Sequence, residues 1–278
     1  MKQTNKTVLS TMKQKNKNNE LLTFGGHLEV FRKMLFRVIF VTLSLSVAIF
    51  YFKQETFTLL LAPRKWNFIT YRSIEYILQS LGWNFHFTPY HIKMISTDLS
   101  AQFMTHISTS IYLGLLIASP YILYELFKFT IPALNEKERK SSVAVAVSMY
   151  FLFSLGVLMN YFLIFPVSFR FLSTYQVDSS IESTITLASY IKTFSTLTFV
   201  MGLVFQLPIV SFILAKMKVL NADSLKRYRK HAFIVILLVS AIITPPDLFT
   251  LVLVSLPMYL LYEVCIFITK SINKQNIS

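Results

Sequence analysis

The 278 residues are 54% hydrophobic and only 14% charged, and their mean hydropathy is +0.55. This composition is more apolar than that of ordinary soluble domains, so it excludes that class and indicates a polytopic membrane protein. The formal net charge of +14 would suit a nucleic-acid partner. However, the cations sit in short clusters between apolar runs, as membrane topology requires, and no folded basic surface is evident. We therefore predict no nucleic-acid binding.

The sequence offers little for redox or metal chemistry. Its one cysteine, Cys265, lies inside an apolar run, so there is neither a disulfide framework nor a thiolate metal site. The five histidines are scattered and none pairs with another inside a predicted span, which argues against haem. No nucleophile–base pair stands out either. We predict no enzyme, no metal and no cofactor.

In chain order, residues 1–26 are predicted to be a basic, disordered tail. The first span is predicted at Met34–Phe52, with Arg37 reaching back to the headgroups. The segment Lys53–Asp98 is too polar to cross. Inside it, apolar residues at helical spacing predict a surface helix over Ser73–Leu81.

Apolar runs predict the later spans at His106–Phe127, Val143–Phe165, Thr193–Ala215, Ala232–Pro246 and Leu248–Tyr262. The last two flank a tight turn and form a hairpin. At about 1.5 Å per residue, each arm covers only ~22 Å of a bilayer core that is ~30 Å thick. Two such short spans would thin the adjacent bilayer.

The predicted fold class is an all-α integral membrane protein with six transmembrane helices and two short C-terminal spans in a hairpin. The membrane domain covers 27–269, and 270–278 form a short C-terminal tail. Twenty of the 27 Lys and Arg fall on the side that carries both termini. The positive-inside rule makes that side cytoplasmic, or the matrix or stroma of an organelle, which gives an N-in/C-in topology.

Three polar residues lie within or beside the predicted spans. Gln206 is ~15 Å along the helix axis from the next cation, near the midplane, and Pro208 favours a kink there. Gln206 either satisfies a freed carbonyl or a neighbouring helix, or it lines a cavity for something hydrophilic. Glu125 is expected to pair with Lys128, and Glu263 to sit at the inner end of the sixth span.

The inner loop Phe129–Lys140 holds two carboxylates, Glu136 and Glu138, among cations. One interpretation is a solvated helix start, where Glu is favourable. The other is an acidic receptor for basic peptide groups, because a carboxylate binds a guanidinium in a bidentate way.

Seven segments in this order resemble one family, TatC, the large subunit of the twin-arginine protein translocase. They are HLEVFRK (27–33), Ala62-Pro63, ISTDLSAQF (95–103), SPYILYELFKFTIPALNEKERK (119–140), NYFLIFPVSFRFL (160–172), GLVFQLP (202–208) and TPPDLF…PMYLLYE (244–263). The resemblance extends over all six predicted spans.

The resemblance implies a subunit that binds twin-arginine signal peptides of folded cargo and helps to move that cargo across an energised membrane. Its implied partners are small single-span Tat subunits (TatA/TatB-like), the lipid bilayer, and further copies in a homo- or hetero-oligomer. It places signal-peptide binding at Glu138 and Arg139, and at Glu29 and Arg32. The family pattern has its N-terminal Glu at the position of Val30, so Glu29 either points elsewhere or the helix start is re-registered.

The resemblance also implies a membrane-buried polar or partner-contact site at Gln206, Pro208 and Glu263. It implies structural turns at Pro63, Pro132, Pro245, Pro246 and Asp247.

Two alternatives come from other classes. An ion or small-solute carrier would show internal repeats and charged midplane residues, and a respiratory-complex subunit would show paired span histidines; neither pattern is seen. The abundance of Phe, Ile, Lys and Asn favours an organelle-encoded protein of the mitochondrial inner membrane. A bacterial plasma membrane and a plastid thylakoid membrane remain as alternatives.

Overall fold

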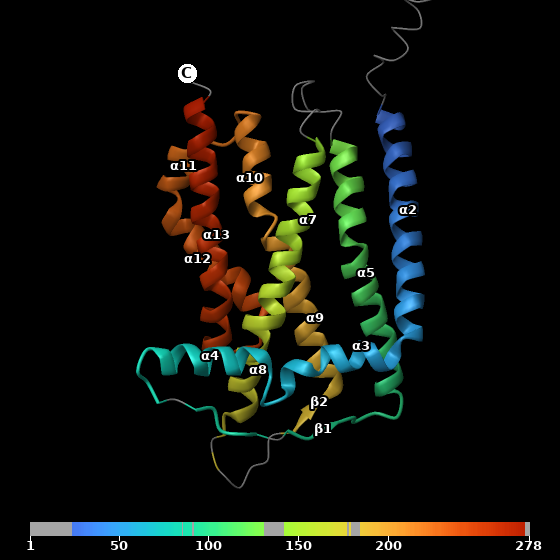
Figure 1. Cartoon of the computed structure of the whole chain (residues 1–278). Coiled ribbons are helices and arrows are strands. Elements are labelled where there is room, and N and C mark those ends of the chain that lie inside the picture. Colours follow the sequence, from blue (N-terminus) through green and yellow to red (C-terminus); the bar gives the residue numbers. More distant parts are fainter. Residues whose placement is uncertain are drawn as a thin grey trace, which may run out of the picture.

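The computed structural model describes residues 24–84, 86–90, 92–130, 142–176, 178 and 184–275. These residues form a bundle of long helices with short elements across one end (Figure 1). We call that end the cap end and the opposite end, which carries the start of the first helix and the end of the last, the N/C end. The elements are α2 (Phe24–Tyr51), α3 (Lys53–Leu60), η1 (Ala62–Arg64), α4 (Ile69–Ser80), β1 (Met94–Ile95), α5 (Ala101–Thr130), α7 (Ser142–Met159), the π-helix η3 (Asn160–Ile164), α8 (Phe165–Thr174), β2 (Ile185–Thr186), α9 (Leu187–Val204), α10 (Leu207–Lys216), α11 (Ala222–Arg227), α12 (Arg229–Ile243) and α13 (Leu248–Gln275).

Five helical segments of the described chain are long and apolar enough to cross a membrane. They are Leu28–Tyr51, Ala101–Leu126, Val145–Thr174, Leu187–Lys216 and Leu248–Lys274. They cover the predicted spans one to four and six, which confirms a helical membrane protein. The predicted fifth span corresponds to α12, whose 15 residues are shorter than these five. The count of six spans therefore stays a prediction.

The prediction of two short hairpin arms is wrong for the second arm. α13 has 28 residues, against 15 in α12, so it is ~42 Å long against ~22 Å. Its charge-free run ends at Glu263, but the helix continues to Gln275, because Glu is a good helix former and does not end a helix; the carboxylate pairs with Arg229 of α12. Lys274 then lies in the last turn, where a cation is favourable. The apolar run therefore ended at the first charged residue, whereas the helix itself extends further.

The third segment changes helix type where its sequence reads NYFLIFP. α7 leads through the π-helix η3 into α8, which has Pro166 in its first turn. Because proline lacks an N–H, the carbonyl of Phe162 loses its helical donor. The hydroxyl of Thr70 in α4 donates to that carbonyl instead. The sequence of η3 and α8 therefore provides an attachment point for the cap.

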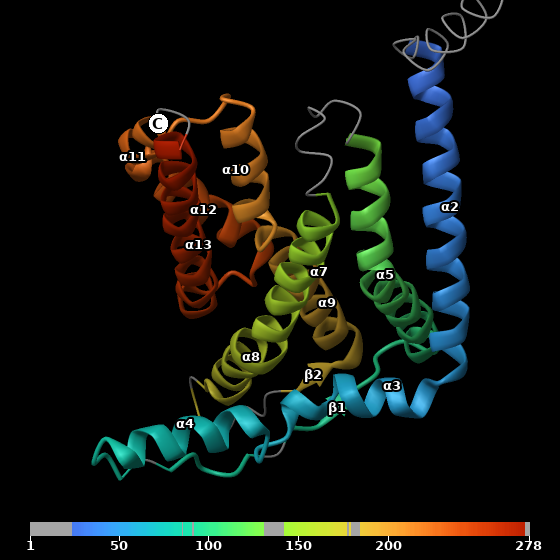
Figure 2. The ribbon, with the colours of Figure 1, turned by 45° about the horizontal axis from the view of Figure 1, so that its top comes forward.

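The cap end is formed by α3, η1 and α4, which lie across the bundle (Figure 2). The helix predicted at Ser73–Leu81 is confirmed as α4, and β1 and β2 add a short parallel pair. The Tyr71 hydroxyl donates to the Pro166 carbonyl at 2.8 Å, and Arg170 stacks on the rings of Tyr71, Phe87 and Tyr90. Burial raises the pKa of the hydroxyls of Tyr71 and Tyr90, so both stay neutral beside Arg170.

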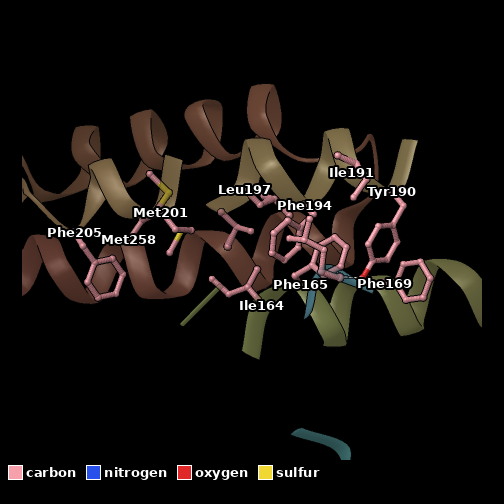
Figure 3. Close-up of a cluster of buried hydrophobic side chains, with 12 residues drawn as sticks. Ile164, Phe165, Phe169, Tyr190, Ile191, Phe194, Leu197, Met201, Phe205 and Met258 are labelled. Atoms are coloured by element: carbon pink, nitrogen blue, oxygen red, sulfur yellow. Dashed lines mark hydrogen bonds between the residues drawn. The ribbon is translucent and has the colours of Figure 1, made fainter. Parts of the chain in front are cut away.

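The buried core lies between α8, α9 and α13. Figure 3 shows the rings of Phe165, Phe169, Tyr190 and Phe194 packed against one another, with Leu197 and Met201 further along α9. Phe165 meets Tyr190 and Phe194 edge-on at centroid distances of 5.0 and 4.9 Å, a favourable aromatic geometry. Next to this core α7 crosses α9 closely, because a Cβ at Gly156 would lie 2.6 Å from the Met201 carbonyl oxygen.

Candidate functional site

Gln206 lies at the break between α9 and α10. α9 ends at Val204, and Pro208 stands in the first turn of α10. The chain turns through Phe205 and Gln206, whose amides reach back to the carbonyls of Met201 and Leu203. The kink that Pro208 predicts is therefore present. Gln206 is only 7% exposed.

The Gln206 side chain joins two helices. Its Nε2 donates to the carbonyl of Met149 in α7 at 3.0 Å. Of the alternatives from the sequence, the contact to a neighbouring helix is thus observed. Its Oε1 is buried and has no hydrogen-bond partner in the described part of the chain. Gln206 retains an acceptor in the bundle interior, which a donor from a partner could use.

A second buried amide occupies the start of the π-helix. Asn160 is fully buried, and its Nδ2 donates to the Thr198 hydroxyl of α9 at 2.8 Å. Its Oδ1 also lacks a partner among the described residues. Asn160 is not among the site residues predicted from the sequence. Its polar type in an apolar run was the only available signal.

At the N/C end, α2 and α5 are joined by an ion pair that the sequence did not predict. Arg37 Nη1 lies 3.1 Å from Glu125 Oε1, and the Tyr121 hydroxyl donates to the same oxygen at 3.1 Å. The predicted pair of Glu125 with Lys128 is wrong, since Lys128 lies over the ring of Tyr124. Arg37 was predicted to reach back to the headgroups; its side chain is half exposed and also binds Glu125, a contact that the prediction did not include. Because the Glu125 side chain is just 6% exposed, a cation from the neighbouring helix is required to compensate it.

The predicted N-terminal binding residues lie on the first turns of α2. Glu29 Oε1 is 2.8 Å from Lys33 Nζ, one helical turn along, and both side chains are exposed. α2 is an uninterrupted helix from Phe24, so its start is not re-registered. Glu29 consequently points about 100° away from Val30, where the resemblance places the family's carboxylate. Arg32 is exposed nearby.

Glu263 joins α13 to α12 at the same end. Its Oε2 accepts from Arg229 Nη2 at 2.6 Å, and the neighbouring Tyr262 hydroxyl donates to the carbonyl of Leu225 at 2.7 Å. Glu263 is thus one half of an inter-helix contact in the half of the bundle toward the N/C end. It is far along the chain from Gln206, and no hydrogen bond or ion pair in the described part of the chain joins the two residues.

The predicted turn residues fall into two groups. Pro63 is buried in η1, and its carbonyl accepts from the Tyr71 hydroxyl. In the turn after α12, the Asp247 amide donates to the Pro245 carbonyl, and Asp247 Oδ1 accepts from the Thr250 amide in the first turn of α13. Pro246 lies between them. Pro132, Glu138 and Arg139 lie outside the described residues.

This arrangement suits binding more than covalent chemistry. No group of three or more His, Cys, Asp or Glu within the described residues could hold a metal ion. What the fold offers is a set of paired charges at the N/C end and buried amides with spare acceptors in the bundle. Such groups can position a peptide or a neighbouring helix.

The fold defines a polytopic helical membrane protein. The family model for the Sec-independent protein translocase protein TatC matches residues 26–257. The chain belongs to the TatC family.

The similarity to relatives and to solved structures extends over nearly the whole chain. TatC of Blattabacterium sp. is 32% identical over 94% of this chain and 99% of its own length. TatC of Escherichia coli K12 is 28% identical over 88% and 86%. A crystal structure described as the twin-arginine translocase receptor TatC superposes with a TM-score of 0.72 at 29% identity, covering 89% of this chain and 99% of that one.

The family assignment bears on two alternatives that the sequence left open, the class of protein and the membrane in which it lies. It replaces the carrier and respiratory-subunit alternatives with a translocase subunit. The mitochondrial membrane that composition favoured finds no support, because the relatives named above are bacterial. An abundance of Phe, Ile, Lys and Asn reflects a genome rich in A and T. Such genomes are not confined to organelles, so this composition does not identify the membrane.

Proposed function

We propose that this chain is the signal-peptide receptor subunit of a twin-arginine translocase in a bacterial plasma membrane. It binds the signal peptide of folded cargo and acts by binding, without covalent chemistry. The observation that carries the proposal is the match in fold and sequence to the twin-arginine translocase receptor over nearly all of both chains. The domain limits that go with it are a tail at 1–26, a six-span domain at 27–269 and a short end at 270–278, into which α13 extends.

Sidedness follows from charge. The N/C end carries most of the Lys and Arg, so it faces the cytoplasm, with both termini inside. α12 then counts as a fifth, short span between the N/C end and the TPPD turn. A signal peptide arriving from the cytoplasm meets the N/C end first.

The pairing of carboxylates at the N/C end supports Glu138 as the receptor group. The described carboxylates at this end each have a cation of the same chain: Glu29 has Lys33, Glu125 has Arg37, Asp223 has Lys226 and Glu263 has Arg229. Each of them already shares its charge with a cation of this chain, which weakens its attraction for a guanidinium. The carboxylates of the loop that holds Glu138 and Arg139 are the remaining candidates, and Glu29 and Arg32 would flank them.

The buried amides suggest where a bound helix would contact the interior of the bundle. The apolar part of the signal peptide, or the helix of a small single-span Tat subunit (TatA/TatB-like), would pack along the bundle near Gln206. Its Oε1 is buried, so the amide would have to rotate, or the break to widen, before this oxygen could accept from a donor on that helix. Pro208 maintains the break at which this amide lies, and Glu263 belongs to the hairpin beside it. Assembly into a homo- or hetero-oligomer with lipid would enclose these faces.

The test compares two peptides on three proteins. The purified full chain, the E138A variant and the D223N control, at an exposed carboxylate of the same end, are each crosslinked to a twin-arginine signal peptide and to its twin-lysine version. We expect the full chain and D223N to prefer the twin-arginine peptide, and E138A to lose the preference by roughly tenfold, as for one charge-assisted hydrogen bond. Equal capture of both peptides by all three proteins would refute the recognition role.

A further inference from the structure

A cationic cavity opens at the cap end, where η1 leads into α4. It has a volume of about 270 Å³. Its lining residues are Arg64, Lys65, Trp66, Asn67, Tyr90 and Ile92. Two adjacent cations, an amide and an indole line it together, and no carboxylate is among them. Such a lining is complementary to an anion.

A third cation stands behind this lining. The guanidinium carbon of Arg170 is 4.8 Å from the ring centroid of Tyr90, and its Nη2 donates to the Thr88 carbonyl at 2.9 Å. Its Nη1 is buried without a hydrogen-bond partner in the described part of the chain. Arg170 therefore adds positive potential next to the cavity.

The location of these cations is unusual. On the proposed topology, the cap end is the translocated side, where membrane proteins are depleted of Lys and Arg. Only seven of the 27 cations fall on this side, and three of those seven are gathered here. The ion pairs found between described residues include neither Arg64 nor Lys65. The charge of this pair is thus not used within the described fold.

The depth of the cavity points to the source of the anion. α3 and α4 lie across the ends of the spanning helices, so the link between them is at the level of a membrane surface (Figure 2). Trp66, at 45% exposure, has the residue type that concentrates at headgroup depth. A lipid phosphate is the anion present at high local concentration at that depth.

We propose that this cavity binds the phosphodiester headgroup of an anionic phospholipid from the outer leaflet. Arg64 offers a planar fork that matches two phosphate oxygens, and Lys65 adds a point charge. The Asn67 amide can donate to one of the same two non-bridging oxygens, each of which accepts more than one hydrogen bond. The bound lipid would hold the α3–α4 link against the bundle. Basic pockets beside spanning helices bind anionic headgroups in this way.

The experiment uses Trp66 as the reporter. The full chain has two tryptophans, so W83F, at an exposed position, leaves Trp66 as the only one. This protein is reconstituted in phosphatidylcholine nanodiscs with a small fraction of nitroxide-labelled phosphatidylglycerol or nitroxide-labelled phosphatidylcholine. Quenching of Trp66 is measured for both labels. We expect the labelled phosphatidylglycerol to quench more strongly at equal fraction.

Two charge-removal variants separate a built site from diffuse attraction. R64Q/K65Q removes the cavity cations, and K53Q/R72Q removes two exposed cations from α3 and α4, the same surface. The apparent affinity for phosphatidylglycerol should fall by roughly tenfold in the first and change little in the second. K65Q alone, at an exposed side chain, covers the case that the double variant does not fold.

Three results would overturn the proposal. They are equal quenching by both lipids, equal loss of preference in the two double variants, and abolition of the preference by inorganic phosphate at constant ionic strength. The last result would identify a site for free phosphate in place of a lipid.

Discussion

Two helix pairs, α2–α5 and α12–α13, are each joined by one arginine and one glutamate in the half of the bundle toward the N/C end. Arg229 and Glu263 are separated by 2.6 Å, and Arg37 and Glu125 by 3.1 Å. The shorter contact is the more exposed one, because the side chain of Glu263 is 34% exposed and that of Glu125 only 6%. The distance between the charged atoms therefore does not show which pair contributes more to stability. The contribution depends on how much it costs to leave one charge without its partner, and that cost is higher for a buried charge.

The packing around the two pairs explains the difference in burial. α2 and α5 run side by side at close range, because a side chain at Gly114 of α5 would collide with Ser46 of α2. Glu125 is enclosed in that contact. α12 is much shorter than α13, so its Arg229 sits near the end of the pair, where solvent or headgroups reach the ions. The same two residue types thus have different roles in the two places.

The largest expected effect is that of Arg37→Gln. Among the described residues, the change leaves the buried Glu125 carboxylate with the Tyr121 hydroxyl as its remaining native donor. Since an uncompensated buried charge is costly, we expect the free energy of unfolding to fall by about 3 kcal/mol. Steric trapping or denaturant unfolding in micelles measures it.

The matched control for this prediction is R37Q/E125Q, which removes both charges. Most of the lost stability should return in the double variant, because no buried charge is left without a partner. If R37Q and the double variant are equally unstable, the loss comes from side-chain packing and not from charge.

The next largest effect is expected from Gly114→Val. Its branched side chain would meet both the side chain and the backbone of Ser46. Overpacking of a close helix contact costs about 2 kcal/mol, and Arg37 and Glu125 would also be forced apart. Ala241→Val, at an exposed position on α12, is the control and should change unfolding by less than about 0.5 kcal/mol. Similar values for both variants would contradict the close packing of α2 on α5.

The sequence was sufficient to predict features with a local signal. Apolar runs placed the long helices, Pro208 marked the break at Gln206, and the helical spacing of Ile74, Ile77 and Leu78 predicted α4. Each of these depends on residues within a few positions of one another. Helix ends were predicted less well, because Glu and Lys are good helix formers and a helix can continue beyond the apolar run, as α13 does after Glu263.

The contacts that join distant segments could not be predicted. Arg37 and Glu125 are 88 positions apart, and their pairing depends on how two helices are rotated against each other. A pairing of Glu125 with a local cation was the best available interpretation, and it was wrong. The cluster of Arg170 with three aromatic rings was missed for the same reason. The hypothesis for Glu138 came from its acidic type among cations and from the family resemblance.

The smallest effect is expected from Arg229→Gln. With Glu263 partly exposed, water and headgroups can solvate the carboxylate that loses its partner. The loss should be about 0.5 kcal/mol, and it should shrink as salt rises, because exposed ion pairs are screened. Denaturant unfolding of R229Q and R37Q at low and high ionic strength tests the contrast: the R229Q difference should nearly vanish in high salt, while the R37Q difference should persist. A loss in R229Q as large and as salt-resistant as that in R37Q would mean that Glu263 is buried in the membrane-embedded protein, and the two helix pairs would then be equivalent.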